Sequence, residues 1–333
     1  MKSVFISSTI VSLLTASSVS ACDLCSVYSA AQARGDLGKG IFAGVAEQFT
    51  HYGTIQVDGS EVPNDAHQHM DSSISQIFAG YNFGEKFGVQ FNVPIIARWY
   101  QRPDDAGGIE RGSLHGIGDA ALIGHFQPFR HETPHSTFSW TILGGVKFPT
   151  GDSGRIAEEA NEGAEVAAAR SPKGALPPPP PVIVASGIHG HDLALGSGSF
   201  DGIVGTGIFA RHGRAFLNGS AQYAVRTKGD FDYEYANDLT WFGGPGAYLL
   251  LNDKYTLSLQ VAVSGEHKDK DKFRGSVADD TGVTTVYLGP QIGATWKENL
   301  STEAGLDIPV VRNNTALQIV PDWRVRAGLT WHF

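Results

Sequence analysis

The last eleven residues, "WRVRAGLTWHF" from Trp323 to Phe333, decide how the rest of the chain is interpreted. Every second residue is apolar or aromatic, and the residues between them are polar or small. This period of two predicts a long β-strand with one apolar and one polar face. A soluble sandwich contains such strands too, so the preceding sequence has to decide between a soluble and a membrane protein.

Similar alternating runs recur along the whole chain. We count twelve predicted strands, at 40–51, 72–83, 87–98, 116–127, 137–148, 199–210, 214–227, 239–251, 256–264, 284–296, 300–310 and 323–333. In the run 300–310, Leu306 and Ile308 share one face while Glu303 and Asp307 share the other. One face suits lipid and the other suits water, which predicts an all-β, transmembrane, antiparallel up-and-down β-barrel. An even number of strands puts both chain ends on the periplasmic side.

The predicted connections alternate between short and long. Tight turns fall at 84–86, 211–213, 252–255 and 297–299, whereas long polar loops fall at 52–71 and 265–283. Short periplasmic turns and long outer loops are typical of bacterial outer-membrane barrels. The connection 128–136 is the exception, because it is longer than this rule predicts for a periplasmic turn.

The N-terminus predicts export. Residues 1–21 carry one early lysine, an apolar middle and a small-residue exit at Val19-Ser20-Ala21, as a signal peptide does. Its removal leaves 24 basic against 34 acidic residues, a formal charge of −10 in place of −9, which disfavours a nucleic-acid partner. No later window contains the roughly 20 consecutive apolar residues of a spanning helix.

This gives three predicted regions: a signal peptide at 1–21, a periplasmic segment at 22–38 and the barrel at 39–333. The composition fits that division, since 41 glycines and only 18% charged residues suit many strands and turns. The barrel contains one unusual connection, 149–198, which is rich first in Ala and Glu and then in Pro. We expect a surface loop there, with a lid or plug over the barrel mouth as the second interpretation.

Four blocks of sequence carry a family resemblance. They are "GIGDAALIGHFQPF" from Gly116, "GGVKFPTGD" from Gly144, "LGSGSFDGIVGTGIFARHGRAFLNGSAQYAV" from Leu195, and the closing "DWRVRAGLTWHF". Together they resemble the outer-membrane family named for the MetA pathway of phenol degradation, over about the last two thirds of the chain. The resemblance implies a transporter-like barrel, with aromatic compounds among the candidate solutes. The N-terminal third and the proline-rich insertion match this pattern poorly.

Strand parity predicts which polar side chains point into the lumen. They are Gln90, Asn92, Arg98, Asp119, Lys147, Asn218, Gln222, Arg226, Gln260, Gln291, Glu303, Asp307, Arg324 and Arg326. A pore lined by both charge signs orients small polar solutes and restricts ions. The alternative is that these charges pair with one another and fill a narrow barrel.

The only two cysteines, Cys22 and Cys25, have three open interpretations. Cys22 follows a lipobox-like Val19-Ser20-Ala21 and is a lipidation candidate, whereas a Cys22–Cys25 disulfide or free thiols suit an oxidising periplasm. A metal or redox pair is the third interpretation. No histidine follows Cys25, so covalent haem is not supported, and we predict no cofactor.

Two His-x-His pairs are weak metal candidates. His67 and His69, and likewise His189 and His191, put two imidazoles on one side of an extended segment, a spacing that suits one shared metal ion. Both pairs fall in predicted outer loops, where such histidines are commonly solvated.

The sequence therefore predicts a bacterial outer-membrane channel for passive or facilitated passage of a small solute. A non-conducting barrel whose outer loops bind a ligand, metal or partner is the alternative. No motif fixes a serine and a histidine at one site, so we expect no enzyme. The predicted partners are outer-membrane lipid, the solute, and the barrel-assembly machinery, which would recognise the C-terminal strand ending in Phe333.

Overall fold

The computed structural model describes residues 39–104, 107–159, 185–297 and 299–333. The predicted signal peptide, Cys22 and Cys25 lie outside the described residues. Within them, no helix is long and apolar enough to cross a membrane.

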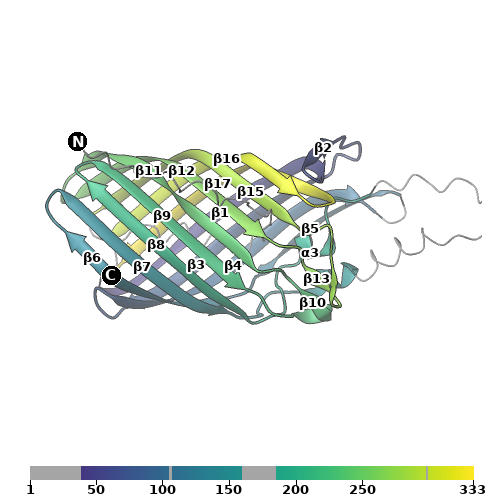
Figure 1. Cartoon of the computed structure of the whole chain (residues 1–333), viewed down its shortest axis with the longest axis horizontal. Helices are drawn as coiled ribbons and strands as arrows, with labels where there is room; N and C mark the ends of the chain where they lie inside the picture. The colour runs from purple at the N-terminus through teal and green to yellow at the C-terminus, as the bar shows by residue number, and fades with distance from the viewer. Residues whose placement is uncertain (1–38, 105–106, 160–184, 298) are drawn as a thin grey trace, which may run out of the picture.

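The strands close into one antiparallel barrel, as predicted, and they tilt strongly against its long axis (Figure 1). The wall is built by β1 (Gly40–Val57), β3 (His69–Asn82), β4 (Phe87–Pro103), β5 (Ile109–Ile117), β6 (Ala121–Glu132), β7 (Ser136–Lys147), β8 (Asp201–His212), β9 (Ala215–Val225), β11 (Asp238–Leu251), β12 (Tyr255–Lys268), β15 (Val283–Trp296), β16 (Leu300–Asn314) and β17 (Leu317–His332). Because β5 and β6 both pair with β4, they form one interrupted strand, and the described barrel has the twelve strands predicted. Pairing of β17 with β1 closes the ring, whereas β5 pairs with β4 alone.

Short elements lie at one end of the barrel. They are β2 (Ser60–Val62), the 3₁₀ turns η1 (Gly154–Glu158) and η2 (Asp230–Asp232), the one-turn helix α3 (Gly190–Leu193), and the small sheet of β10 (Tyr233–Glu234), β13 (Lys272–Phe273) and β14 (Ser276–Val277). Figure 1 shows α3, β10 and β13 at the end opposite the C-terminus. We call this the outer end and the other the periplasmic end.

Side-chain exposure follows the period of two. On β16, Leu306 and Ile308 are 43% and 48% exposed, whereas Asp307 between them is fully buried. The apolar exterior and polar interior are those of a barrel that spans the bacterial outer membrane. Exposed aromatic side chains gather at the periplasmic turns and at the ends of the strands beside them; these are Phe83, Phe87, Phe129, Phe138, Tyr255, Trp296, Trp331 and Phe333. Such a belt sits at the level of the lipid headgroups.

The structure corrects the prediction of a long periplasmic turn at 128–136. Strand β6 continues to Glu132, and a three-residue turn follows in which the Thr133 amide donates to the Ser136 carbonyl at 2.7 Å. The register between β6 and β7 shifts between Phe126 and Phe129. A β-bulge therefore accommodates Pro128, which cannot donate a ladder hydrogen bond, so the strand does not end there.

The predicted outer loops 52–71 and 265–283 were also too long. Strand β1 runs on to Val57, β3 begins at His69, and β12 continues to Lys268. The wall is uneven as a result, since β1 and β4 are 18 and 17 residues long while β7 and β8 have 12 each. The long connection between β7 and β8 therefore leaves the wall where its strands are short.

Candidate functional site: the filled lumen

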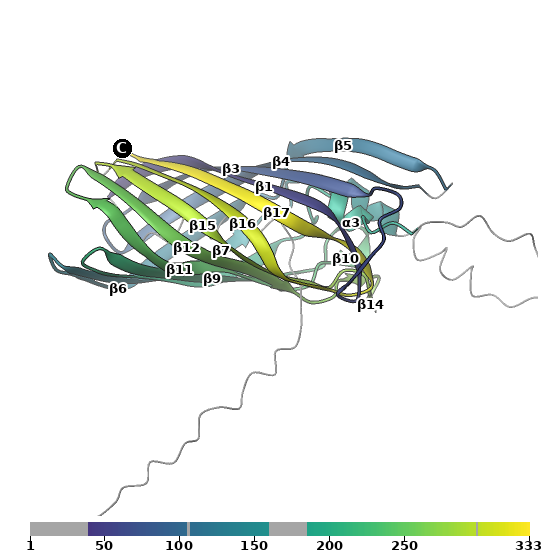
Figure 2. The same cartoon turned by 90° about the horizontal axis from the view of Figure 1, so that it is seen from above.

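The connection between β7 and β8 folds into the barrel. We call its described residues, 149–159 and 185–200, the insert. Figure 2 shows α3 of the insert among the strands, toward the outer end. The amides of Leu195 and Gly196 donate to the Asp152 carbonyl at 2.9 and 3.0 Å, so the outgoing and returning chains meet at Asp152. The expected surface loop is therefore wrong for these residues, many of which are buried.

Apolar contacts seat the insert against one inner wall. Ile188 and Leu193 are fully buried in a cluster with inward-facing side chains of β1, β3, β4 and β17, among them Tyr100 and Ile319. On the other side, Ile156 and Ala194 pack with Tyr233 and Tyr235, which belong to β10 and the residues after it. The few apolar side chains of the insert therefore pack inside the barrel, because contact with other apolar side chains removes their surface from water.

Hydrogen bonds from the wall fix the backbone of the insert. Arg98 of β4 donates to the carbonyls of Asp192 and Ala194, the latter at 2.9 Å. The Gln68 side-chain oxygen accepts from the Gly187 amide at 2.8 Å, and the Ile319 amide donates to the Gly187 carbonyl at 2.8 Å. These bonds satisfy buried backbone groups that a loop inside a barrel would otherwise leave unpaired.

The two ends of the insert are anchored by a chain of buried charges, which we call the anchor cluster: Asp119, Lys147, Asp201, Arg226 and Asp238. The Lys147 ammonium lies 2.5 Å from Asp119 and 2.9 Å from Asp201, and the Arg226 guanidinium lies 2.9 Å from Asp201 and 2.5 Å from Asp238. Asp119 also accepts the amides of Gly151 and Ser197, at 3.0 and 2.9 Å. One carboxylate thus joins the wall to both ends of the insert.

A second buried group, the wall cluster, consists of Asp307, Arg324 and Arg326. The Asp307 carboxylate accepts from the Nε atoms of Arg324 and Arg326 at 3.0 and 2.7 Å. Arg324 also stacks over Tyr287 at 3.8 Å, and Arg326 lies over the Phe242 ring at 4.7 Å. These contacts join wall strands only and do not involve the insert.

All fourteen polar residues predicted to face the lumen lie on the inner side of the wall or at its break between β5 and β6. All are buried except Glu303, which is half-buried; the buried ones are Gln90, Asn92, Arg98, Asp119, Lys147, Asn218, Gln222, Arg226, Gln260, Gln291, Asp307, Arg324 and Arg326. Several pair with each other, as Gln291 does with Glu303 at 2.9 Å. Their contact with a solute stays a prediction.

Cavities in the described part of the barrel are uneven. A cavity of about 730 Å³ lies among the outer connections and is lined by Asp58, Glu234, Lys270 and Lys272 among others. Beside the insert, a cavity of about 70 Å³ touches Met70, Arg98 and His191. Near Gln48 and Arg326 only about 10 Å³ is open. The widest of these three cavities therefore lies among the outer connections.

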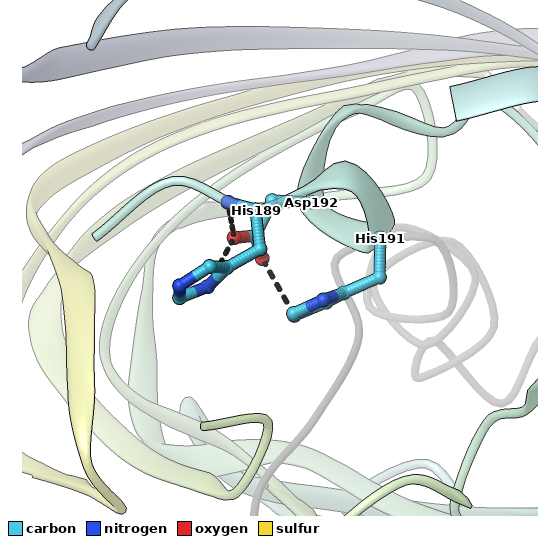
Figure 3. A group of neighbouring side chains, drawn as sticks. All are labelled: His189, His191 and Asp192. Atoms are coloured by element: carbon cyan, nitrogen blue, oxygen red, sulfur yellow. Dashed lines mark hydrogen bonds and ion pairs between the residues drawn. The ribbon is translucent and has the colours of Figure 1, made fainter. Parts of the chain in front are cut away.

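The two His-x-His pairs differ in their surroundings. His67 is exposed and His69 half-exposed at the start of β3, whereas His189 and His191 are each 7% exposed inside the insert. The expectation of solvated histidines in outer loops is therefore wrong for the second pair. Figure 3 shows both imidazoles turned toward the carboxylate of Asp192.

Glu159 lies behind His191 and changes its protonation. The Glu159 carboxylate accepts from Nδ1 of His191 at 2.8 Å. Burial alone lowers the pKa of His191, but Asp192 and Glu159 outweigh it and raise the pKa to about 10. Burial raises the pKa of Glu159, yet His191 brings it down to about 2. Asp192 adjoins the histidines in sequence, but no sequence signal connects Glu159 with them across 32 positions.

No protein-family model and no curated protein matches this chain. Among solved structures, an outer membrane channel from Pseudomonas putida F1 matches 90% of this chain and 97% of its own with a TM-score of 0.60 and 12% identity. The toluene transporter of Ralstonia pickettii (8% identity, 90% of this chain and 91% of its own) and the translocator domain of the autotransporter NalP from Neisseria meningitidis (12%, 92% and 92%) give TM-scores of only 0.37 and 0.40. The likeness to the Pseudomonas putida channel shows a shared barrel fold.

Proposed function

We propose that this protein is an outer-membrane channel for a small solute and that the insert plugs its lumen. The observation that carries the proposal is the meeting of the two ends of the insert at Asp152. The wall strands pair without the insert, through the complete ring from β1 to β17. The insert is thus an addition to a finished barrel, and moving it opens the passage without breaking the wall.

Polar atoms in the lumen support a hydrated passage. Buried side-chain atoms of six inward-facing residues on six different strands make no hydrogen bond within the described protein; they belong to Thr50, Ser72, Gln127, Gln222, Thr240 and Thr285. A buried polar atom without a partner costs roughly 1–3 kcal/mol. Water would supply these hydrogen bonds in a hydrated lumen, so this lining supports the proposed passage.

The lining also contains an apolar strip. Phe42, Ile74, Phe78 and Ile96 form a buried cluster on the inner face of β1, β3 and β4, and Leu195 of the insert packs against it. Apolar and charged surface in one lumen suits a small solute with both characters. Together with the resemblance to the family of the MetA pathway of phenol degradation, this strip makes aromatic compounds the first solutes to screen.

The test is single-channel conductance of the purified, folded protein in a planar bilayer. The chain ends around Asp152 and Gly196 permit a variant in which residues 153–195 are replaced by two glycines. We expect small or intermittent currents from the intact protein and steady, severalfold larger currents from the variant. Aromatic solutes added to the variant should block the current transiently if they enter the lumen.

A control turns Arg274-Gly275, the exposed two-residue connection between β13 and β14 at the same end of the barrel, into two glycines by the change Arg274→Gly. This replacement should leave the current unchanged. If the variant without the insert stays silent although it is folded, the channel proposal fails. The non-conducting barrel that binds a ligand or partner then becomes the better description.

A further inference from the structure

The loop around α3 brings two imidazoles and a carboxylate together. His189 precedes the helix, and its amide donates to Asp192 Oδ2 at 2.9 Å, which fixes the carboxylate between the two rings. His189 Nδ1 lies 3.7 Å from Asp192 Oδ2, and His191 Nε2 lies 3.3 Å from Asp192 Oδ1 (Figure 3). One ligand atom from each residue lies within 4.8 Å of the others.

One of these atoms has no ordinary hydrogen bond. His189 is 7% exposed, and its side chain faces the Asp192 amide as in a capping box, but its buried Nδ1 makes no hydrogen bond of ordinary geometry in the described protein. Its separation of 3.7 Å from Asp192 is too long for such a bond. A buried imidazole nitrogen aimed at a carboxylate without bonding it is an available ligand.

Carboxylates also face the outer nitrogens of both rings. Glu159 accepts from Nδ1 of His191 at 2.8 Å, and Asp280 lies 3.5 Å from Nε2 of His189. Metal-binding histidines commonly place the second ring nitrogen against a carboxylate, which orients the ring and makes the ligand nitrogen more basic. Both rings therefore have a carboxylate behind them and face Asp192 in front.

From this arrangement we propose that His189, His191 and Asp192 bind a divalent first-row transition metal ion such as Zn²⁺. Imidazole nitrogens favour such ions over Ca²⁺ and Mg²⁺, which prefer oxygen ligands, and the ion displaces the proton that His191 carries on Nε2. Ligand atoms around tetrahedral Zn²⁺ lie about 3.4 Å apart, so the three side chains close by little more than 1 Å through rotation. Two cations lie beside these residues and both are already paired: Arg98 donates to the carbonyls of Asp192 and Ala194, and Lys268 is held by Asp271 at 2.6 Å.

The ion would join the start and end of α3, within the segment that fills the lumen. Metal binding therefore stabilises the seated insert, because the ligand positions exist only in the folded segment. The binding itself does not depend on conduction, so it is tested separately from the channel proposal.

The experiment measures binding of the metal alone to the full, folded chain. Cys22→Ser/Cys25→Ser is the starting protein, since the two thiols are alternative ligands. After chelator treatment, it is titrated with Zn²⁺ against a chromophoric competitor, and Co²⁺ serves as a spectroscopic probe. We expect one Zn²⁺ per chain and Co²⁺ absorption bands of a low-coordinate nitrogen and oxygen site. Asp192→Asn and His189→Gln should each weaken binding at least tenfold.

The other His-x-His pair supplies the matched control. His67→Gln/His69→Gln changes two histidines of the same spacing and should leave the affinity unchanged. Glu159→Gln touches no metal ligand atom and should lower the affinity about 10- to 100-fold with the one-to-one stoichiometry kept. Folding of each variant is checked by its heat-modifiable migration on gels. The proposal is overturned if the starting protein binds no stoichiometric Zn²⁺, if folded His189→Gln binds as tightly, or if the control pair abolishes binding.

Discussion

The anchor cluster and the wall cluster use the same chemistry for different structural roles. Both bury aspartates against basic side chains on the inner face of the barrel. In the wall cluster, Asp307, Arg324 and Arg326 lie on two neighbouring strands, and every contact stays within the wall. In the anchor cluster, Asp119 holds Lys147 of the wall and the backbone of the insert at once. The wall cluster therefore acts as a brace between wall strands, whereas the anchor cluster acts as a latch that holds the insert to the wall.

The largest expected effect is on the brace. Asp307→Asn leaves two buried guanidinium groups without their shared carboxylate, and we expect it to destabilise the barrel by about 3–5 kcal/mol. Denaturant unfolding in detergent measures this loss. Because the insert keeps its contacts, the folded fraction should show the closed-channel current of the parent protein. Unchanged stability would mean that the wall cluster does not brace the barrel.

The second-largest effect is expected at the apolar contacts that seat the insert in the lumen. Leu193→Ala removes a fully buried side chain of α3, and a buried Leu→Ala change costs about 2–5 kcal/mol. We expect this cost to fall on the seated insert, so that channel openings become frequent while denaturant unfolding of the wall changes less. Leu306→Ala is the matched control, since Leu306 is 43% exposed on the lipid face. Equal currents from the two variants would show that the seated insert does not control channel opening.

The latch should give a smaller effect. Asp119→Asn keeps the size of the side chain but removes the charge that faces Lys147, which retains Asp201 as a partner. We expect a cost of about 1–3 kcal/mol and more frequent openings, measured as open time in the planar bilayer. If Asp119→Asn lowers barrel stability as much as Asp307→Asn and leaves gating unaltered, the distinction between latch and brace is lost.

The smallest thermodynamic effect is expected at the chain end. Phe333 is 73% exposed, and its amide donates one bond to the Ile41 carbonyl at 2.9 Å. Deletion should change the stability of protein refolded in vitro by no more than about 1 kcal/mol. We nevertheless expect impaired assembly in cells, because the terminal aromatic is the proposed signal for the barrel-assembly machinery. Normal membrane assembly of the truncated chain would contradict that role.

Strand parity was predictable because it is local. Successive side chains of a strand point to opposite faces, so the positions of Leu306, Asp307 and Ile308 follow from their order alone. The prediction of a long turn at 128–136 was wrong because proline usually indicates the end of a strand. Here, pairing of Phe129 with Trp140 continues β6 beyond Pro128. Ladder hydrogen bonds beyond a bulge outweigh the preference of a single residue.

By itself, the sequence determined the twelve strands and the alternation of their faces, but its set of inward charges omitted Asp201 and Asp238. Only the tertiary structure decided which charges meet and where the long connection goes. Glu159 and His191, or Asp119 and Ser197, are far apart in sequence and come together only after the ring has closed. The insert turns inward because the closed wall supplies apolar surface for Ile188 and Leu193 and hydrogen bonds to the carbonyls of Gly187 and Ala194. Period and parity are properties of neighbouring residues, whereas the seat of the insert is a property of the assembled barrel.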